Sequence, residues 1–235
     1  MSFAVSSHSR ARFVVIAALA LLVPAAVRAQ SSAIVDEGTF VVTRNGTVVG
    51  RESFRIVRSP GPNGQVLVCS GQSAIGDKRT TSRLATDSAC VPVSYEANIS
   101  MRGQQVTHLQ GRGRPGRFSV LLQAPTGESA KDYLLNNGAI LLDDEVVHQF
   151  YFVSRLTSHE QLVVIDPQGG SQATYTLVDR GAETVTVARH SLQARHYALV
   201  SASGSRDVWV DDEGRLLKVA VPERNLVAVR DELPR

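Results

Sequence analysis

The chain has 235 residues, of which 43% are hydrophobic, 20% are charged and 6% are aromatic, and its formal net charge is +3. A chain of this length fits one all-β domain, which can exceed about 200 residues without splitting. The positive charge comes from the first 29 residues, which contain three arginines and no acid, so that 22 basic and 22 acidic residues remain. This balance disfavours nucleic-acid binding, which requires a basic excess.

Residues 1–29 have the organisation of a secretory signal peptide. A basic start precedes the apolar run Phe13–Val23, and small residues precede a cleavage position after Ala29. The alternative, a membrane anchor, needs about 20 apolar residues to cross a bilayer, and this run is much shorter. We therefore expect a mature chain, residues 30–235, that forms a single β-rich domain in the periplasm or outside the cell, with no transmembrane segment.

Most of the mature chain alternates between apolar and polar side chains with a period of two, which is typical of antiparallel strands. The first hairpin is predicted to turn at Asn45-Gly46, because both turn positions accept positive φ. Gly50 is the expected position of a β-bulge that keeps the core-facing residues of the second strand in phase. The core-facing residues expected in this hairpin are Phe40, Val42, Phe54 and Ile56.

The segment Val91–Ser100 has the clearest alternation, with Val93 and Tyr95 expected on the buried face. Asp179-Arg180-Gly181 is predicted to be a tight turn between two strands. About a dozen strands joined by hairpins predict a mainly β fold, a curved antiparallel meander sheet that forms a half-barrel or barrel. The other expected strands are 65–74, 80–86, 106–110, 117–123, 130–135, 139–142, 161–165, 173–178, 183–189, 192–200, 207–210, 215–221 and 225–229.

A single helix is predicted in the mature chain, over residues 143–156. Its apolar side chains recur at i, i+4 and i+7, and Asp143 or Asp144 is expected to cap its first turn. We expect this short helix to pack in the concavity of the sheet. The residues that carry the apolar pattern are Val146, Phe150 and Val153.

Cys69 and Cys90 are an even number of cysteines in a chain expected to be exported, so they are predicted to form a disulfide. The bridge would close a loop of about 20 residues and stabilise the fold by roughly 3 kcal/mol. The alternative is two separate buried thiols. No histidine lies at ligand spacing from either cysteine, so no metal site is predicted.

The sequence has no nucleophile elbow, phosphate loop, zinc-binding helix motif or dinucleotide fingerprint, and no cofactor is predicted. Asp144 and His148 are four residues apart in the expected helix and are the candidate catalytic pair. A capping aspartate and an ordinary helix histidine are the simpler interpretation. Alternating Gly and Arg can bind anionic head groups or phosphates, although solvated loop charge is the simpler interpretation. The arginines concerned are Arg102, Arg112, Arg114 and Arg117.

The segment Asp207–Val221, DVWVDDEGRLLKVAV, resembles the late W-x-D-x-x-G-x-L hairpin of a group of uncharacterised bacterial envelope proteins. These proteins also have a signal peptide and an opening hairpin like Gly38–Val57. Their architecture is similar to the LolA/LolB-type half-barrel, in which a curved antiparallel sheet with a helix in its concavity holds acyl chains. The resemblance spans most of the mature chain, but the residues that carry it are turn and packing residues: Gly50, Trp209, Asp211 and Gly214.

The favoured hypothesis is an exported, non-enzymatic protein that binds a lipid or another apolar ligand in its curved sheet. A rolled sheet of this size needs more filling than one short helix supplies, so a cavity is expected beside the helix. The first alternative is an envelope structural or interaction module. The second is an uncharacterised hydrolase that uses His148 with Asp144. The residues expected to line the cavity are Val93, Tyr95, Leu122 and Phe150.

Overall fold

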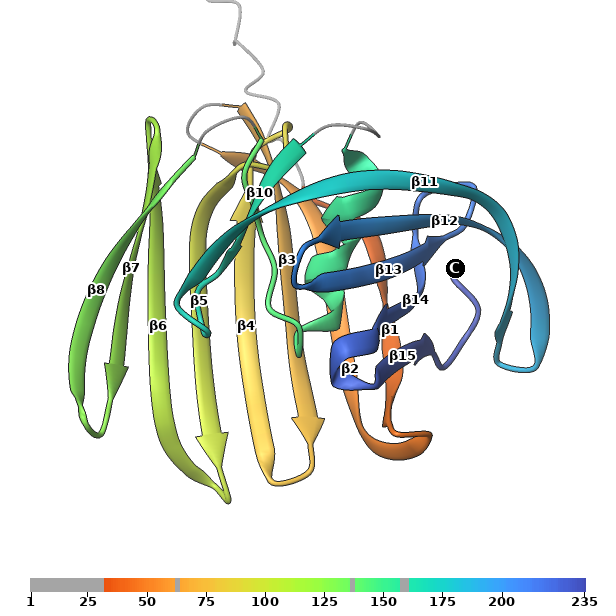
Figure 1. The fold of residues 1–235 in the computed structure, drawn as a ribbon, viewed down its shortest axis with the longest axis horizontal. Coiled ribbons are helices and arrows are strands. Elements are labelled where there is room, and N and C mark those ends of the chain that lie inside the picture. Colours follow the sequence, from red (N-terminus) through yellow and green to blue (C-terminus); the bar gives the residue numbers. More distant parts are fainter. Residues whose placement is uncertain (1–31, 62–63, 136–137, 157–160) are drawn as a thin grey trace, which may run out of the picture.

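The computed structural model describes residues 32–61, 64–135, 138–156 and 161–235, so the predicted leader lies outside the described residues. The described strands form one 15-stranded sheet that curls around a short helix (Figure 1). The helical segments are η1 (Val147–Arg155) and η2 (Pro222–Arg224). The strands are β1 (Ala33–Arg44), β2 (Thr47–Gly61), β3 (Gly64–Ile75), β4 (Lys78–Thr86), β5 (Pro92–Met101), β6 (Gln104–Arg114), β7 (Arg117–Ala124), β8 (Gly127–Leu134), β9 (Ile140–Leu141), β10 (Gln161–Asp166), β11 (Ser171–Val187), β12 (His190–Ser201), β13 (Gly204–Val210), β14 (Leu216–Val221) and β15 (Leu226–Arg230).

The strand order is β8-β7-β6-β5-β4-β3-β2-β1-β15-β14-β13-β12-β11-β10-β9. The chain therefore meanders outward from β1 to one edge of the sheet, crosses to the other edge, and meanders back to pair β15 with β1. Only β9 and β10 are parallel among these pairs, and η1 is the crossover between them. The predicted fold class, a curved antiparallel meander with one short helix in its concavity, is confirmed.

The first hairpin forms as predicted. Asn45 and Gly46 both have positive φ, 51° and 76°, which the tight turn requires. The register between β1 and β2 shifts between Val42 and Thr43, which pair with Gly50 and Val48, so the predicted bulge is present. A Cβ on Gly50 would lie 1.8 Å from the carbonyl oxygen of Ala74, and only glycine allows β3 to approach this closely.

The predicted turn at residues 179–181 is wrong, because β11 continues through it as one 17-residue strand. The segment forms a bulge instead, in which the Asp179 carboxylate accepts the N–H of Gly181 at 2.9 Å and the register with β12 shifts. Gly181 has φ of 91°, a conformation that suits a bulge as well as a turn. Beyond this point, Val185 and Val187 belong to a second small hydrophobic cluster with Trp209 and Leu217.

The helix η1 lies in the concavity of the sheet (Figure 1), and its buried apolar side chains belong to the main hydrophobic cluster. Phe150, Tyr151 and Phe152 of η1 are at most 1% exposed. The helix is shorter than predicted and is a 3-10 helix that begins at Val147. The expected cap by Asp143 or Asp144 is wrong, because Asp143 instead accepts the N–H of Glu145 in a turn that precedes the helix.

The N-terminus of η1 is capped from the wall of the sheet by Glu52 of β2. Its carboxylate accepts the backbone N–H groups of Val147 and His148 at 3.0 and 2.7 Å, and Nδ1 of His148 lies 2.9 Å from the same group. Glu52 is 0% exposed, and a buried carboxylate requires such partners. The negative charge also lies where the helix dipole favours it. Glu52 therefore holds the helix in the concavity.

The turn before η1 carries the acidic run Asp143-Asp144-Glu145, and each carboxylate contacts a different part of the sheet. Asp143 accepts the side-chain amide of Gln168 in the β10–β11 turn at 2.7 Å. The other two form ion pairs that join the turn to β13 and η2, and to β1 and β4. These pairs are Asp144–Arg206 at 2.6 Å, Asp144–Arg224 at 2.9 Å, Glu145–Arg44 at 2.8 Å and Glu145–Lys78 at 2.8 Å.

Replacing Glu52 with alanine should destabilise the fold by roughly 3 kcal/mol or more, because His148 and two helix N–H groups lose a buried charged partner. The free energy of unfolding, measured by urea denaturation, tests this. Glu128→Ala, on the exposed edge strand β8, is the control and should cost less than about 0.5 kcal/mol. Equal losses in the two variants would show that Glu52 does not anchor the helix.

Candidate functional site

The predicted catalytic pair does not form. Asp144 binds Arg206 and Arg224, whereas His148 contacts Glu52 and lies 3.3 Å, through Nε2, from the hydroxyl of Ser82. Asp144 precedes the helix, so the two side chains do not share a helical face as the i, i+4 spacing predicted. The hydrolase hypothesis that depended on this pair is therefore dropped.

Ser82, His148 and Glu52 are hydrogen-bonded in the order found in serine hydrolases, but they lie inside the barrel. The side chains of His148 and Glu52 are each 1% exposed. A Cβ on Gly71 would lie 2.5 Å from Nδ1 of His148, so the imidazole packs directly against the backbone of β3. Ser82 borders a hollow on the sheet, but neither His148 nor Glu52 lines it. The hydrogen bonds that link Ser82, His148 and Glu52 therefore anchor η1 to the sheet.

The four residues predicted to line a cavity lie in different environments. Tyr95 and Phe150 are packed in the core and are 2% and 0% exposed, and Leu122 is half-buried against the same cluster. Val93 does not share the buried face with Tyr95, which corrects the alternation expected from the sequence. A register shift between Ala85 and Thr86 forms a bulge at Val93 that leaves it exposed.

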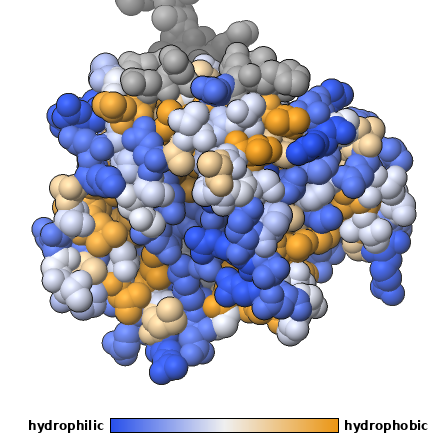
Figure 2. All heavy atoms as spheres, in the orientation of Figure 1, coloured by the Kyte–Doolittle hydropathy of each residue, from blue (hydrophilic) through white to orange (hydrophobic). Residues whose placement is uncertain are grey.

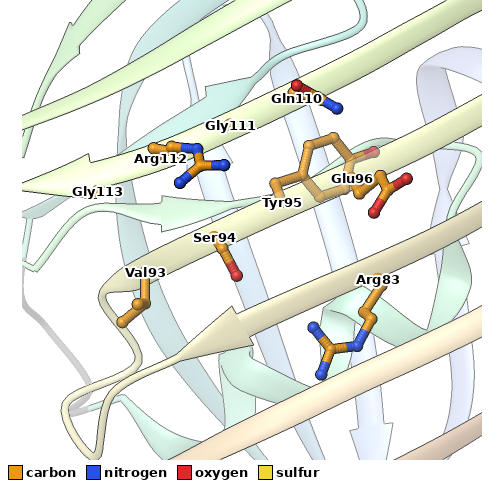
Figure 3. Close-up of a pocket in the computed structure, with 9 residues that line it drawn as sticks. All are labelled: Arg83, Val93, Ser94, Tyr95, Glu96, Gln110, Gly111, Arg112 and Gly113. Carbon is orange, nitrogen blue, oxygen red and sulfur yellow. The ribbon is translucent and has the colours of Figure 1, made fainter. Parts of the chain in front are cut away.

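An outer-face pocket of about 380 Å³ lies over β4, β5 and β6 (Figure 3). Val93 and Ser94 line it, and most of its other side chains point away from the core, among them two arginines and one glutamate. It therefore differs from the apolar cavity that the sequence predicted. The lining residues are Arg83, Val93, Ser94, Tyr95, Glu96, Gln110, Gly111, Arg112 and Gly113.

A second pocket, of about 280 Å³, lies where the β2–β3 hairpin, the β4–β5 loop and the last turn of η1 meet, and we call it the rim pocket. Its lining contains apolar residues and two arginines, Arg58 and Arg155. Arg155 stacks over the ring of Tyr151, 4.7 Å from the centroid, and donates a hydrogen bond to the Tyr151 hydroxyl. The lining residues are Arg58, Gln65, Val66, Leu67, Ser88, Cys90, Tyr151 and Arg155.

The predicted disulfide is not formed, because Cys69 and Cys90 are separate buried thiols. Cys69 pairs with Leu84 within the sheet and donates to the carbonyl oxygen of His148 at 3.4 Å. Cys90 lies in the loop beyond the end of β4 and lines the rim pocket. Burial raises the pKa of the Cys90 thiol to about 11. The two buried cysteines therefore lie in different surroundings, Cys69 within the sheet and Cys90 at the rim pocket.

Asp143 is the buried acid beside η1 whose ionisation is most affected. Burial raises its pKa to about 6, and the negative charge of Asp166 acts in the same direction, whereas the N–H of Glu145 and the charge of Lys78 oppose it. Its backbone N–H donates to the side-chain oxygen of Gln149 at 2.7 Å. Asp143 thus belongs to the polar contacts at the start of η1.

The structural charges that sequence reasoning missed are Glu52, Asp36 and Arg230. Arg230 and Asp36 form an ion pair at 2.9 Å with both side chains 1% exposed, and the guanidinium packs against Gly38, where a Cβ would lie 2.9 Å from Nη2. For Glu52, the alternation of inward and outward residues along its strand contained a signal that could have identified it. Glu52 shares the inward face of its strand with Phe54 and Ile56, and a charge among apolar inward residues indicates a buried partner.

The described part of the chain contains no group of three or more His, Cys, Asp or Glu side chains placed to hold a metal ion. Within those same ranges, no helical segment has the length and hydropathy needed to cross a bilayer.

These features define a β-barrel-like protein in which an antiparallel sheet is wrapped around one short helix. Residues 123–231 match the family model of DUF6134, a domain of unknown function. The fold is similar to that of a beta-barrel-like protein of domain of unknown function DUF1849 from Brucella abortus, with a TM-score of 0.51 and 8% identity over 86% of this chain and 97% of that chain. At this identity the likeness concerns the fold alone. No curated protein matches the chain.

Both cysteines should react with a maleimide after the protein is unfolded without reductant, giving two labels per chain by mass spectrometry. In the folded protein labelling should be slow, because burial raises the pKa of both thiols. If the unfolded, unreduced protein instead carries no maleimide label, the two cysteines form a disulfide.

The stability contribution of Asp143 should fall as pH rises. Its folded-state pKa, about 6, exceeds the ordinary value of 3.8, so the folded protein binds more protons between these values, and the contribution is lost as pH rises through about 6. Relative to Asp143→Asn, the wild type should lose on the order of 3 kcal/mol of unfolding free energy between about pH 4 and pH 7. The prediction is contradicted if the unfolding free energies of the two proteins, measured by urea denaturation, change with pH by the same amount.

Proposed function

We propose that the protein is an exported, non-enzymatic binding protein that holds one small amphipathic anion in the rim pocket. The observation that carries the proposal is a pocket lining that combines the apolar side chains Val66 and Leu67 and the ring of Tyr151 with the basic residues Arg58 and Arg155. Such a lining suits a ligand with a short acyl chain and a carboxylate. The signal-peptide pattern of residues 1–29 supports export.

The filled interior supports a ligand at the rim rather than beside the helix. The side chains of η1 occupy the concavity, and Phe150, at 0% exposed, packs in the core. The rim pocket, at about 280 Å³, lies just below the roughly 300–1,000 Å³ typical of small-molecule sites. A single short acyl chain therefore fits this site better than a complete two-chain lipid.

The two arginines supply the specificity for an anion. Arg58 is exposed and has no hydrogen-bond or ion-pair partner among the described residues, so its charge is available to a ligand. Arg155 is held by the stacking and hydrogen bond to Tyr151, and this contact orients it with little further loss of side-chain freedom on binding. A carboxylate accepts hydrogen bonds from guanidinium groups with good geometry.

Octanoate should bind saturably in isothermal titration calorimetry, with octanol roughly tenfold weaker because it lacks the charge that the arginines attract. Arg58→Gln should weaken octanoate binding about tenfold. Ser88→Trp, which places a large side chain at an exposed position of the pocket lining, should abolish it.

The matched control is Arg51→Gln, which removes the same charge from the same strand outside the rim pocket and should leave octanoate affinity unchanged. If Arg51→Gln weakens binding as much as Arg58→Gln, the attraction is a general effect of charge and the proposal is wrong. An octanoate affinity that Ser88→Trp does not change would also exclude this pocket as the site.

A further inference from the structure

The outer-face pocket brings two unpartnered arginines together across three adjacent strands. Ser94 of β5 pairs directly with Arg112 of β6, and Arg83 of β4 pairs with Glu96, two residues further along β5. Side chains on one face of neighbouring strands are within about 5 Å at directly paired positions and about 8 Å at diagonal ones. Both arginines can therefore reach a group bound over Ser94.

Neither Arg83 nor Arg112 has a hydrogen-bond or ion-pair partner among the described residues, although Glu96 lies on the same face. Figure 3 shows the hydroxyl of Ser94 between the two guanidinium groups, with the Glu96 carboxylate further along the strand. Several other exposed arginines of the sheet are neutralised by an acidic partner, such as Arg117 by Asp132 at 3.0 Å and Arg102 by Asp77 at 3.0 Å. The pocket thus holds two positive charges without a hydrogen-bonded or ion-paired partner among the described residues, one hydroxyl donor and the negative charge of Glu96.

The backbone beside these residues is shaped so that Arg112 stays close to Ser94. A Cβ on Gly113 would lie 2.5 Å from the carbonyl oxygen of Pro92, so β5 and β6 approach at a distance that only glycine permits. The bulge at Val93 leaves that side chain on the outer face, where it forms an apolar wall of the pocket. The hollow of about 380 Å³ is large enough for a tetrahedral anion and part of its substituent.

We propose that this outer-face pocket binds a phosphate group, with Arg83 and Arg112 contacting its oxygens from either side and Ser94 donating a hydrogen bond between them. Guanidinium groups match phosphate geometry, and a doubly charged phosphate benefits from two such groups more than a carboxylate does. Glu96 limits the affinity by repulsion. This site is separate from the rim pocket and does not depend on what that pocket binds.

The probe is inorganic phosphate, measured by isothermal titration calorimetry at constant ionic strength, alongside sedimentation with phosphatidylcholine vesicles that contain or lack phosphatidic acid. Arg83→Gln and Arg112→Gln should each weaken binding about tenfold, and Glu96→Gln should tighten it. Arg114→Gln removes an exposed charge from the same strand outside the pocket and should have little effect.

Phosphate binding without a preference for phosphatidic acid vesicles identifies a soluble phosphate as the ligand, whereas a preference that Arg112→Gln removes identifies a lipid headgroup. Either result supports the site. An absence of saturable binding to both probes overturns it, and so does an equal loss in Arg114→Gln and Arg112→Gln. All these positions are exposed, so urea denaturation should show unchanged stability, and octanoate binding at the rim should be unaffected.

Discussion

The contact between Glu52 and the first turn of η1 is the interaction on which the interior of this protein depends. A sheet of this curvature has a concave face that must be covered, and η1 supplies the aromatic side chains that cover it. A nine-residue 3-10 helix has little stability of its own, because its hydrogen-bond geometry is poor. One carboxylate from β2 satisfies two of its free N–H groups and orients His148. The contact with Glu52 thereby holds in place the helix whose aromatic side chains cover the concave face.

Charge pairs join parts of the chain that are distant in sequence. The acidic run before η1 reaches strands from both arms of the meander, and the buried Asp36–Arg230 pair links the first strand to the last. The β1–β15 pairing is the seam where the two arms meet, and Arg230 lies on it. Buried pairs of this kind stabilise little on their own, but removing one partner is costly. The cost of separating Asp36 from Arg230 therefore favours the pairing of β1 with β15.

Because the helix fills the concavity, binding at the rim and on the outer face is a more consistent proposal than binding in a central cavity. Figure 2 shows hydrophilic and apolar residues interspersed over the visible face, without one large apolar patch. Both proposed sites use arginines that the fold leaves without acidic partners. The fold likeness to a DUF1849 protein concerns this same barrel-like architecture and not the chemistry of either pocket.

The sequence by itself determined what depends on local periodicity: most strands, the Asn45-Gly46 hairpin, the Gly50 bulge and the presence of one helix. It did not determine where β11 would bulge instead of turn, that Val93 would point outward, or that the helix would begin at Val147 and be capped by Glu52, 95 residues earlier. A glycine with positive φ serves a turn or a bulge equally, and a bulge reverses the side-chain alternation. Pairing with neighbouring strands selects between these outcomes, and the partner of a buried charge is set by the curvature of the whole sheet.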